Sequence, residues 1–395
     1  MEYAALVSGG VDSAVALHTI AARADGPVRA YYLKIWLEDE LSFLGECPWE
    51  EDLQYARDVC AAARVPLEVV PLQDQYYERV VSYTLAELKA GHTPSPDIFC
   101  NQRIKFGAFY DAIGGSADRI VTGHYARVLR PGGDGGIGGD REVGGDGGVG
   151  GSGAGVAPVR LGMAPDAVKD QTYFLSHLSQ EQLSRSEFPL GEMTKSQVRA
   201  RANKLELSNR DRPDSQGICF LGRIKYTDFV RHYLGDREGP ITNADTGEEL
   251  GRHRGAWFYT IGQRQGLGLG NGPWYVVRRD IERNVVEVSH AMRVAQRARR
   301  RFMVGNLHWI AGPPAEAVAS GGRLMLKLRH GPERTACTLE VPGGGALDGA
   351  RELAVTMEQA DRGVAPGQFA VFYHGEICLG AGMIIDAPEE QERWK

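Results

Sequence analysis

The first 125 residues alternate short apolar segments with segments of helical periodicity, and this alternation constrains the fold more than any other feature. Parallel strands need a crossover connection, usually a helix, so the pattern is typical of βαβ units. We predict an N-terminal α/β domain with a doubly wound parallel sheet. The expected strands are 3–7, 28–36, 67–70 and 118–124, and the expected helices are 11–24, 50–65 and 75–90.

The character of the sequence changes in its second half, and a length of 395 residues predicts two to three domains. Short alternating strand candidates begin at Val285 and are typical of a small β-barrel or sandwich. We predict an α/β domain over 1–213, a small mixed module over 214–295 and an all-β barrel over 296–395. More than half of the segment 131–156 is glycine, which favours a flexible insertion between two strands.

The net charge of −6 gives the chain no overall positive field, although a local basic face can still bind phosphate. Two basic stretches, 199–212 and 293–302, are either solvated faces or contacts to RNA phosphates. No apolar run approaches 18 residues, which argues against a membrane span. The chain begins directly with a strand, which favours a cytoplasmic protein; a mitochondrial or plastid protein without its transit peptide is the alternative.

The segment SGGVDS, Ser8–Ser13, lies where the first expected strand ends and the first expected helix begins. Gly9 and Gly10 allow a tight turn that brings backbone N–H groups to an anion, and the helix N-terminus adds the positive end of its dipole. Asp12 is suited to hold a Mg²⁺ ion beside a phosphate. The loop lacks the GK[ST] ending of a Walker A motif, and a plain glycine-containing turn is the alternative to a nucleotide site.

Six cysteines are spread along the chain without a CxxC pair or zinc-ligand spacing, which favours a reducing compartment and no structural zinc. Cys60, Cys337 and Cys378 lie in helix-like or strand-like runs and are expected to be structural. Cys47 is expected to be a structural residue in a loop.

Cys100 and Cys219 differ from the others, because turn residues flank both and neither falls within a clear amphipathic period. We expect both in loops. Two such cysteines beside an ATP site can relay sulfur, since one thiolate can carry a persulfide and the second can attack it and form a disulfide. Two inert cysteines are the alternative.

Nine motifs in a fixed order carry a resemblance to a known family. SGGVDS resembles the PP-loop of the ATP pyrophosphatase superfamily. The others are PDIFCN (96–101) with IKFG (104–107), TGHYAR (122–127), KDQTYFL (169–175), FPLG (188–191), DSQGICFLG (214–222), YTIGQRQGLG (259–268), APGQFAVFY (365–373) and CLGAGMI (378–384). Together they resemble the tRNA-uridine 2-sulfurtransferase family (MnmA/TrmU) over nearly the whole chain.

The resemblance implies an enzyme that uses ATP and Mg²⁺ to adenylate the 2-carbonyl oxygen of the wobble uridine in tRNAs for Glu, Gln and Lys. Cys219 would carry a persulfide, and Cys100 would be its partner thiol, ending in a Cys100–Cys219 disulfide. The products would be 2-thiouridine, AMP and pyrophosphate. The resemblance also implies a tRNA-binding middle module, a monomer, and a sulfur-relay protein or cysteine desulfurase as sulfur donor.

The implied site residues fall into three groups. ATP is expected at Leu6, Val7, Ser8, Gly9, Gly10, Val11, Asp12, Ser13, Leu33 and Gly123. The target base is expected at Ser95, Pro96 and Asp97, where Asp97 either manages a proton beside Cys100 or only forms a turn. Further tRNA contacts are expected from His124, Lys169, Asp170, Gln171, Arg329, His330 and Gln368.

Three positions depart from the family pattern: Ser95, Gln216 and Ala14 stand where Asn, Thr and Ser are usual, which leaves details of base contact open. A ligase or amidotransferase that activates a small carboxylate would also use a PP-loop, but it would leave the two cysteine segments unexplained. An RNA-binding protein with a degenerate nucleotide fold is disfavoured by the intact SGGVDS loop.

Overall fold

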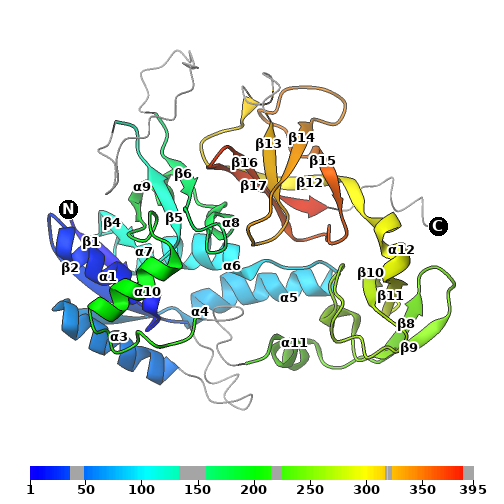
Figure 1. The fold of residues 1–395 in the computed structure, drawn as a ribbon, viewed down its shortest axis with the longest axis horizontal. Coiled ribbons are helices and arrows are strands. Elements are labelled where there is room, and N and C mark those ends of the chain that lie inside the picture. The colour runs from blue at the N-terminus through cyan, green and yellow to red at the C-terminus, as the bar shows by residue number, and fades with distance from the viewer. Residues whose placement is uncertain (36–48, 133–156, 215–223, 316–317, 319–322, 386–395) are drawn as a thin grey trace.

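The computed structural model describes residues 1–35, 49–132, 157–214, 224–315, 318 and 323–385. Figure 1 shows an α/β part at the N-terminus, a small module with its own sheet, and a β-barrel formed by the C-terminal strands. The expectations for Cys47, Cys219 and nearly all of the segment 131–156 fall outside the described residues.

The N-terminal sheet has the strand order β3–β2–β1–β4–β7, and every neighbouring pair in it is parallel. This confirms the predicted doubly wound α/β fold. The strands are β1 (Tyr3–Leu6), β2 (Val28–Lys34), β3 (Leu67–Pro71), β4 (Arg119–Val121) and β7 (Ser186–Glu187).

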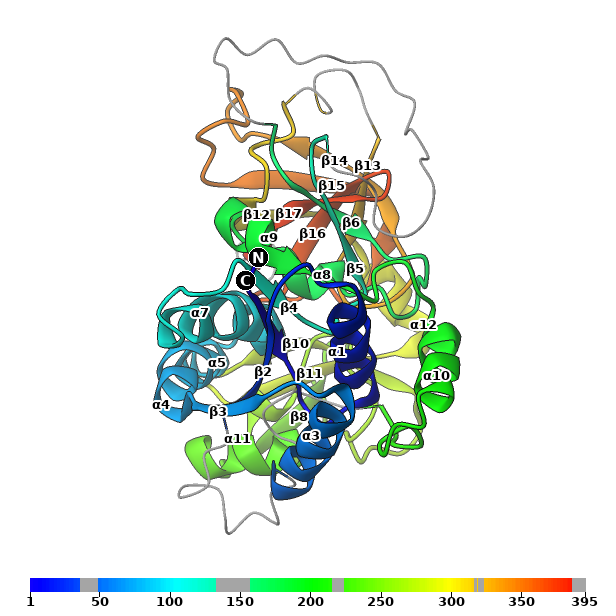
Figure 2. The ribbon, with the colours of Figure 1, turned by 90° about the vertical axis from the view of Figure 1, so that its left-hand side faces the viewer.

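Helices cover both faces of this sheet, as Figure 2 shows. One face carries α1 (Val11–Arg23), α3 (Trp49–Ala63) and α10 (Lys195–Lys204). The other carries α4 (Gln73–Tyr76), η2 (Tyr77–Val81), α5 (Ser82–Lys89), α6 (Pro96–Phe99), η3 (Cys100–Ala108) and α7 (Phe109–Ala112), where η2 and η3 are π-helical.

The short central strand β1 is buried on both faces, which explains its unbroken apolar sequence. Tyr3 and Ala5 pack with Val15 and Leu17 of α1 in one hydrophobic core. Ala4 points to the opposite face and belongs to a second core. The carboxyl end of β1 leads directly into the SGGVDS loop, so the packing of β1 fixes where that loop starts.

The small module contains a four-stranded sheet with the order β10–β11–β8–β9 around a compact apolar core. One pair, β11–β8, is parallel and the other two are antiparallel, so the sheet is mixed as predicted. Its elements are α11 (Tyr226–Leu234), β8 (Gly239–Asn243), β9 (Glu249–His253), η4 (Ala256–Phe258), β10 (Trp274–Asp280), β11 (Val285–His290), α12 (Ala291–Val294) and η5 (Ala295–Arg297).

Six C-terminal strands form a closed antiparallel barrel, because β12 pairs with β15 on one side and with β17 on the other. This outcome selects the barrel over the sandwich. The strands are β12 (Arg299–Trp309), β13 (Leu324–Lys327), β14 (Thr335–Glu340), β15 (Leu353–Asp361), β16 (Phe369–His374) and β17 (Ile377–Ile385).

A hairpin from the N-terminal half of the chain extends the barrel sheet. Strands β5 (Ala126–Leu129) and β6 (Arg160–Met163) pair antiparallel, and β6 also pairs with β17. The glycine-rich segment therefore connects two paired strands, as predicted. After this hairpin the chain returns to the α/β part through α8 (Thr172–Leu175) and α9 (Gln180–Arg185).

Candidate active site

The SGGVDS loop occupies the carboxyl end of β1, where ligands bind in open α/β sheets. Gly9 has a φ of +75°, and a Cβ built on it would lie 2.4 Å from the backbone oxygen of Asp52. Position 9 therefore requires glycine both for its dihedral angle and for the close approach of α3.

The N-terminus of α1 is open toward the loop, because its N-cap is Gly10 and no side chain caps the first turn. Ser13 Oγ accepts a hydrogen bond from the Ser8 N–H at 3.1 Å and donates to the Gly10 carbonyl at 3.0 Å. These bonds close the loop on itself. Uncapped N–H groups at the positive end of a helix dipole are suited to phosphate oxygens.

Two further positions expected to contact ATP flank this loop. A Cβ on Gly123 would lie 2.8 Å from the carbonyl carbon of Asp12, so the chain after β4 touches the start of α1. Leu33 lies near the end of β2, the strand that pairs with β1. The loop, Leu33 and Gly123 thus all lie along the carboxyl edge of the sheet.

Two side chains that are distant in sequence form hydrogen bonds to the backbone of the SGGVDS loop. Asn209 donates its amide N–H to the Gly9 carbonyl at 2.8 Å, and Arg212 donates to the same oxygen at 3.2 Å. Arg212 also pairs with Asp52 and lies over the ring of Tyr55 on α3. These anchors were not predicted, since nothing in the sequence indicates which loop returns to Gly9.

Asp12 is the charged member of the loop and is held from two sides. Lys195 Nζ lies 2.8 Å from both carboxylate oxygens, and the Tyr125 hydroxyl donates to one of them at 2.7 Å. Burial and the neighbouring Asp12 raise the pKa of Tyr125, so the hydroxyl stays a donor. Lys195 was also not predicted, although the capping box formed by Thr194 and Gln197 marks the start of its helix.

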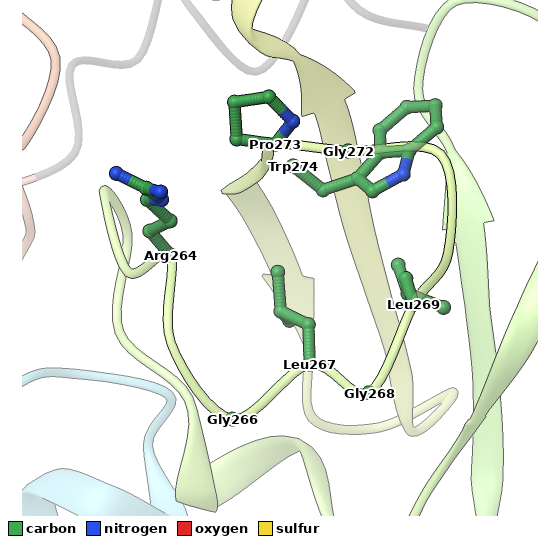
Figure 3. Close-up of a pocket in the computed structure, with 8 residues that line it drawn as sticks. All are labelled: Arg264, Gly266, Leu267, Gly268, Leu269, Gly272, Pro273 and Trp274. Carbon is green, nitrogen blue, oxygen red and sulfur yellow. The ribbon is translucent and has the colours of Figure 1, made fainter.

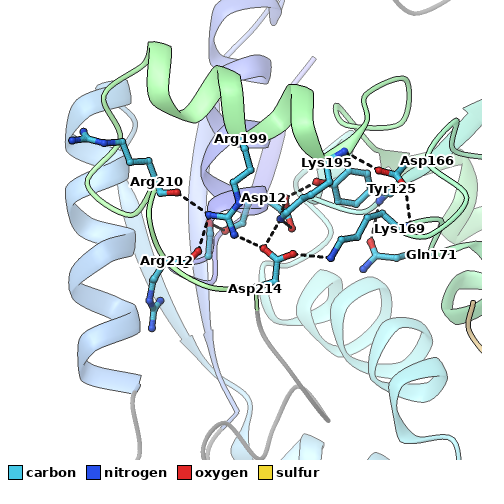
Figure 4. Close-up of polar contacts among 12 residues, drawn as sticks. Asp12, Tyr125, Asp166, Lys169, Gln171, Lys195, Arg199, Arg210, Arg212 and Asp214 are labelled. Atoms are coloured by element: carbon cyan, nitrogen blue, oxygen red, sulfur yellow. Dashed lines mark hydrogen bonds and ion pairs between the residues drawn. The ribbon is translucent and has the colours of Figure 1, made fainter.

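Asp214, the last described residue before the segment with Cys219, is bound to the same cluster. It accepts hydrogen bonds from Lys169 at 2.7 Å and pairs with Lys195 at 2.8 Å and with Arg199. Burial raises the pKa of this carboxyl, but the hydrogen bonds from the two lysines outweigh burial and hold the pKa well below its usual range. Figure 4 shows Lys195 between Asp12 and Asp214, which links them through one ammonium.

Cys100 lies at the start of η3, in a helical stretch that begins at Pro96, and its side chain is 1% exposed. The expectation of a loop position is therefore wrong. Pro96 at the first helical position and the turn residues before it mark a helix start, because the missing N–H of proline costs nothing there. In this conformation the Cys100 thiol is covered.

The chain leading to Ser95 and Cys100 is fastened to both other parts of the molecule. Arg279 of β10 donates to the Gly91 carbonyl at 2.8 Å and to the Thr93 hydroxyl at 3.1 Å. From the barrel side, the Thr93 N–H donates to the Pro366 carbonyl at 2.8 Å. The small module and the barrel thus jointly fix the approach to the Ser95–Cys100 segment.

Several residues that are expected to contact tRNA lie next to the hydroxyl of Tyr173 on helix α8. The Tyr173 hydroxyl donates to the carbonyls of Leu328 at 3.3 Å and Phe369 at 3.2 Å, which adjoin Arg329 and Gln368. The side chains of Tyr173 and Ser95 also lie close enough to interact. Residues expected at the target base and on the barrel therefore meet at Tyr173.

The next residue of α8 makes a second connection of this kind. The Phe174 ring stacks on His330 with centroids 4.8 Å apart, and the Phe174 carbonyl accepts from the Asn101 side chain at 3.1 Å. Arg329 forms an ion pair with Asp361, and its side chain is 56% exposed. Arg329 thus keeps a solvent-exposed guanidinium at the edge of this region.

Two residues expected to contact the tRNA are buried instead. Asp170 has no exposed surface and pairs with Lys327 of the barrel at 2.8 Å, so its carboxylate offers nothing to an RNA partner in this conformation. Burial, together with the nearby Lys105, lowers the pKa of His124 well below its ordinary value. His124 is therefore neutral and hydrogen-bonded to Thr122.

The other two residues of the KDQ motif, Lys169–Gln171, point toward the SGGVDS loop, Ser8–Ser13, which is called the phosphate loop from here on. Lys169 pairs with Asp214, as described above. Gln171 accepts a hydrogen bond from the Tyr125 N–H at 3.0 Å through its side-chain oxygen. Since Tyr125 in turn bonds to Asp12, the KDQ motif connects the barrel, through Asp170, to the phosphate loop.

Within the described residues, no group of three or more His, Cys, Asp or Glu side chains is arranged to hold a metal ion. Over the same residues, no helix has the length and apolar character needed to cross a membrane. Burial raises the pKa of the Cys60 thiol to about 11 and that of the Cys337 thiol to about 12, which fits their predicted structural role.

A parallel sheet with a glycine turn and an uncapped helix at the end of β1 defines an α/β protein of the PP-loop class. Family models match the chain in three consecutive parts: the tRNA methyl transferase HUP domain over 1–223, the tRNA methyl transferase PRC-barrel domain over 227–290 and the aminomethyltransferase beta-barrel domain over 299–384.

Curated relatives identify the family. The tRNA-specific 2-thiouridylase MnmA 1 of Bacteroides thetaiotaomicron is 39% identical, and MnmA of Porphyromonas gingivalis is 40% identical, each over 97% of this chain and 99% of the relative. The chain therefore belongs to the tRNA-specific 2-thiouridylase family. The U34-tRNA thiolase NcsA from Methanococcus maripaludis aligns with a TM-score of 0.31 and 15% identity over 59% of this chain and 66% of its own, a likeness too weak to support a conclusion.

Proposed function

We propose that this protein thiolates the wobble uridine of tRNA, with ATP and Mg²⁺ as cofactors. The observation that carries the proposal is the convergence on α8. Helix α6 packs against α8, and Asn101 and His330 both contact Phe174 of α8. Tyr173 of α8 bonds to the Phe369 carbonyl, next to Gln368 of the barrel. Gln171, the N-cap residue of α8, is linked through Tyr125 to Asp12 of the phosphate loop.

The phosphate loop provides the binding groups for the nucleotide. The N–H groups at the start of α1 and the hydroxyl of Ser8 would donate hydrogen bonds to phosphate oxygens. The Asp12 carboxylate would hold Mg²⁺. Bound ATP supplies the adenylate that makes the uracil 2-carbonyl oxygen a good leaving group. Lys195, already in contact with Asp12, adds a fixed positive charge beside that position.

The sulfur step assigns different tasks to the two cysteines. The terminal sulfur of a Cys219 persulfide bonds to C2 of the uracil as AMP leaves. The Cys100 thiolate then attacks the Cys219 sulfur, breaks its bond to the transferred sulfur and forms a Cys100–Cys219 disulfide. An external thiol must reduce that disulfide before the next turnover. Asp97, three residues before Cys100, accepts the proton that the Cys100 thiol loses.

The remaining assignments follow the family. The tRNAs for Glu, Gln and Lys are the substrates, and the sulfur reaches Cys219 from a sulfur-relay protein or a cysteine desulfurase. The protein acts as a monomer in the cytoplasm, with its three domains dividing at 213/214 and 295/296.

The experiment measures 2-thiouridine by mass spectrometry of tRNA nucleosides after incubation with ATP, Mg²⁺, unmodified tRNA and a persulfide donor. We expect Cys100→Ser and Cys219→Ser each to abolish thiolation while tRNA binding persists. Cys337→Ser is the matched control, because this thiol lies in the barrel core and should not affect the product. Normal thiolation by either active-site variant would contradict the two-cysteine step.

The burial of Cys100 adds a second measurement. If Cys100 reacts with the Cys219 persulfide, the segment around it must open once substrates bind, so its alkylation rate should rise with tRNA and ATP present. An ATP–pyrophosphate exchange driven by a small carboxylic acid without tRNA would instead favour a ligase.

A further inference from the structure

A pocket in the small module is not explained by the proposed reaction. It has a volume of about 370 Å³ and is formed by the chain between Arg264 and Trp274, which includes the end of the YTIGQRQGLG motif. This volume lies within the range of about 300–1,000 Å³ that is usual for small-molecule sites. Figure 3 shows Arg264 and the Trp274 ring on opposite sides of the pocket, with Leu267 between them.

The wall on one side of the pocket is a fixed aromatic ring. The Trp274 indole N–H donates to the Gly270 carbonyl at 2.9 Å, and the ring meets His290 edge-on with centroids 5.3 Å apart. Side chains added at Gly268 and Gly270 would meet nothing within 4 Å, so the surrounding backbone is open to a ligand. A tryptophan held in this way is a surface on which a flat base can stack.

The other side of the pocket is positively charged. Arg264 makes no hydrogen bond or ion pair with any residue that the structure describes. Residues 255–301 contain nine arginines and three acidic residues, a net charge of +6 in a chain whose total is −6. An unpaired guanidinium in such a region favours a phosphate-bearing ligand.

The chain just before the pocket contacts the barrel beside Arg329. A Cβ on Gly262, just before the pocket, would lie 3.1 Å from Cα of Gly363, and a Cβ on Gly363 would lie 2.7 Å from the Arg329 guanidinium. Trp274 and Arg279 lie on the same strand, and Arg279 holds the Thr93 hydroxyl. Five residues of strand span about 17 Å, so Trp274 lies about that far along β10 from the residue that holds the segment leading to Cys100.

We propose that this pocket binds an unpaired nucleotide of the tRNA other than the target uridine, with its base stacked on Trp274 and its phosphate paired with Arg264. This inference rests on the proposed function, because it takes tRNA as the substrate. The pocket thereby adds affinity and fixes the position of the RNA strand next to the reacting base.

Equilibrium tRNA binding by the full chain provides the test. Stacking contributes about 1–3 kcal/mol per base, so Trp274→Ala should weaken tRNA binding by about 5- to 150-fold, whereas Trp274→Phe should retain most of the affinity. Arg264→Gln should reduce the slope of log K against log salt by about 0.7, the value for one phosphate of a single strand. Arg264→Lys should keep that slope.

Arg29→Gln is the matched control for the charge change, because Arg29 is exposed at the amino-terminal end of β2, on the edge of the sheet opposite the phosphate loop. Its tRNA affinity and salt slope should equal those of the wild type. Thermal unfolding of each variant checks that folding is intact.

Unchanged tRNA affinity in a folded Trp274→Ala variant would overturn the inference. So would a loss restricted to thiolation with a protein sulfur donor, since that result would make the pocket a protein-docking site. Failure of the proposed function is distinguishable: the wild type would then bind tRNA without forming 2-thiouridine, and the pocket variants would still be judged by their affinities.

Discussion

Single backbone positions decide whether the phosphate loop forms. Gly9 and Gly10 are adjacent in sequence, yet only Gly9 has a positive φ and a backbone atom 2.4 Å from the point where a Cβ would stand. Gly10 has an extended conformation, and the nearest neighbour of a Cβ there would be the Ser8 hydroxyl at 3.4 Å. The two glycines therefore have different physical tasks.

This difference predicts losses of stability of different size from the same substitution. Gly9→Ala should lower the free energy of unfolding by at least about 1–2 kcal/mol, because an alanine in the left-handed region carries that penalty even before the clash with Asp52. Gly10→Ala is the control and should cost less, about 0.5–1 kcal/mol, the usual difference between glycine and alanine at an N-cap. Urea unfolding measures both; equal losses would contradict this assignment.

Cysteine behaviour is also decided at the residue scale, but by surroundings rather than by local sequence. Cys60 and Cys337 lie in regular helix and strand patterns, which predicted their burial. Cys100 is equally buried, although turn residues precede it, because Pro96 starts a helix that packs into a core. The turn residues before Cys100 indicated that the chain changes direction there, but they did not indicate whether the thiol is exposed to solvent.

At the scale of elements, aromatic and imidazole side chains form the contact between α6, the residues just after α8 and the barrel. His177 lies 5.8 Å from Phe99, 4.5 Å from Phe369 and 5.3 Å from His308, measured between ring centroids. Burial lowers the pKa of His177 to about 3, and the neighbouring His308 and Arg103 contribute to the same shift. The imidazole is therefore neutral in the folded protein at every pH above that value.

This environment predicts acid sensitivity at the interface. Below a pH of about 6.5 the unfolded chain binds a proton at His177 and the folded chain does not, so the free energy of unfolding falls as the pH drops from about 6.5 toward 3. His177→Gln cannot be protonated and should show a shallower decline over this range. Urea unfolding at several pH values measures it, with His232→Gln, at an exposed position on α11, as control. Identical slopes for the wild type and His177→Gln would refute the prediction.

At the scale of the whole molecule, the barrel and the α/β part are joined by a buried ion pair. Lys327 of β13 and Asp170 before α8 are 157 positions apart, and neither side chain has exposed surface. Thr172 also donates to Asp170, and the Ala164 N–H completes its hydrogen bonds. The pair thus fixes the position of the KDQ motif relative to the barrel.

Removing one partner should leave a buried charge without compensation. We expect Lys327→Met to destabilise the protein by about 3–5 kcal/mol, and Asp170→Asn in the same chain to restore part of that loss. The exposed pair between Arg323 and Glu358 provides the control, since Arg323→Met should cost at most about 1 kcal/mol. Denaturant midpoints measure all three; a Lys327→Met variant as stable as the wild type would show that the pair does not join the two parts.

The sequence by itself determined the parallel sheet, the position of the phosphate loop and the presence of a C-terminal β structure. These features depend on local periodicity and on glycine in a strand-to-helix turn, which neighbouring residues specify. The motifs and their order also carry the family resemblance, which predicts the segments that take part in the chemistry.

Only the tertiary structure decided which of these motifs meet. The ion pairs of Lys195 with Asp12 and Asp214, the burial of Asp170 and the contact of Tyr173 with Ser95 all join segments far apart in the chain. Such contacts depend on how sheets and barrel pack, and local patterns contain no information about packing partners. For the same reason the local sequence does not reveal that the loop between Arg264 and Trp274 encloses a pocket.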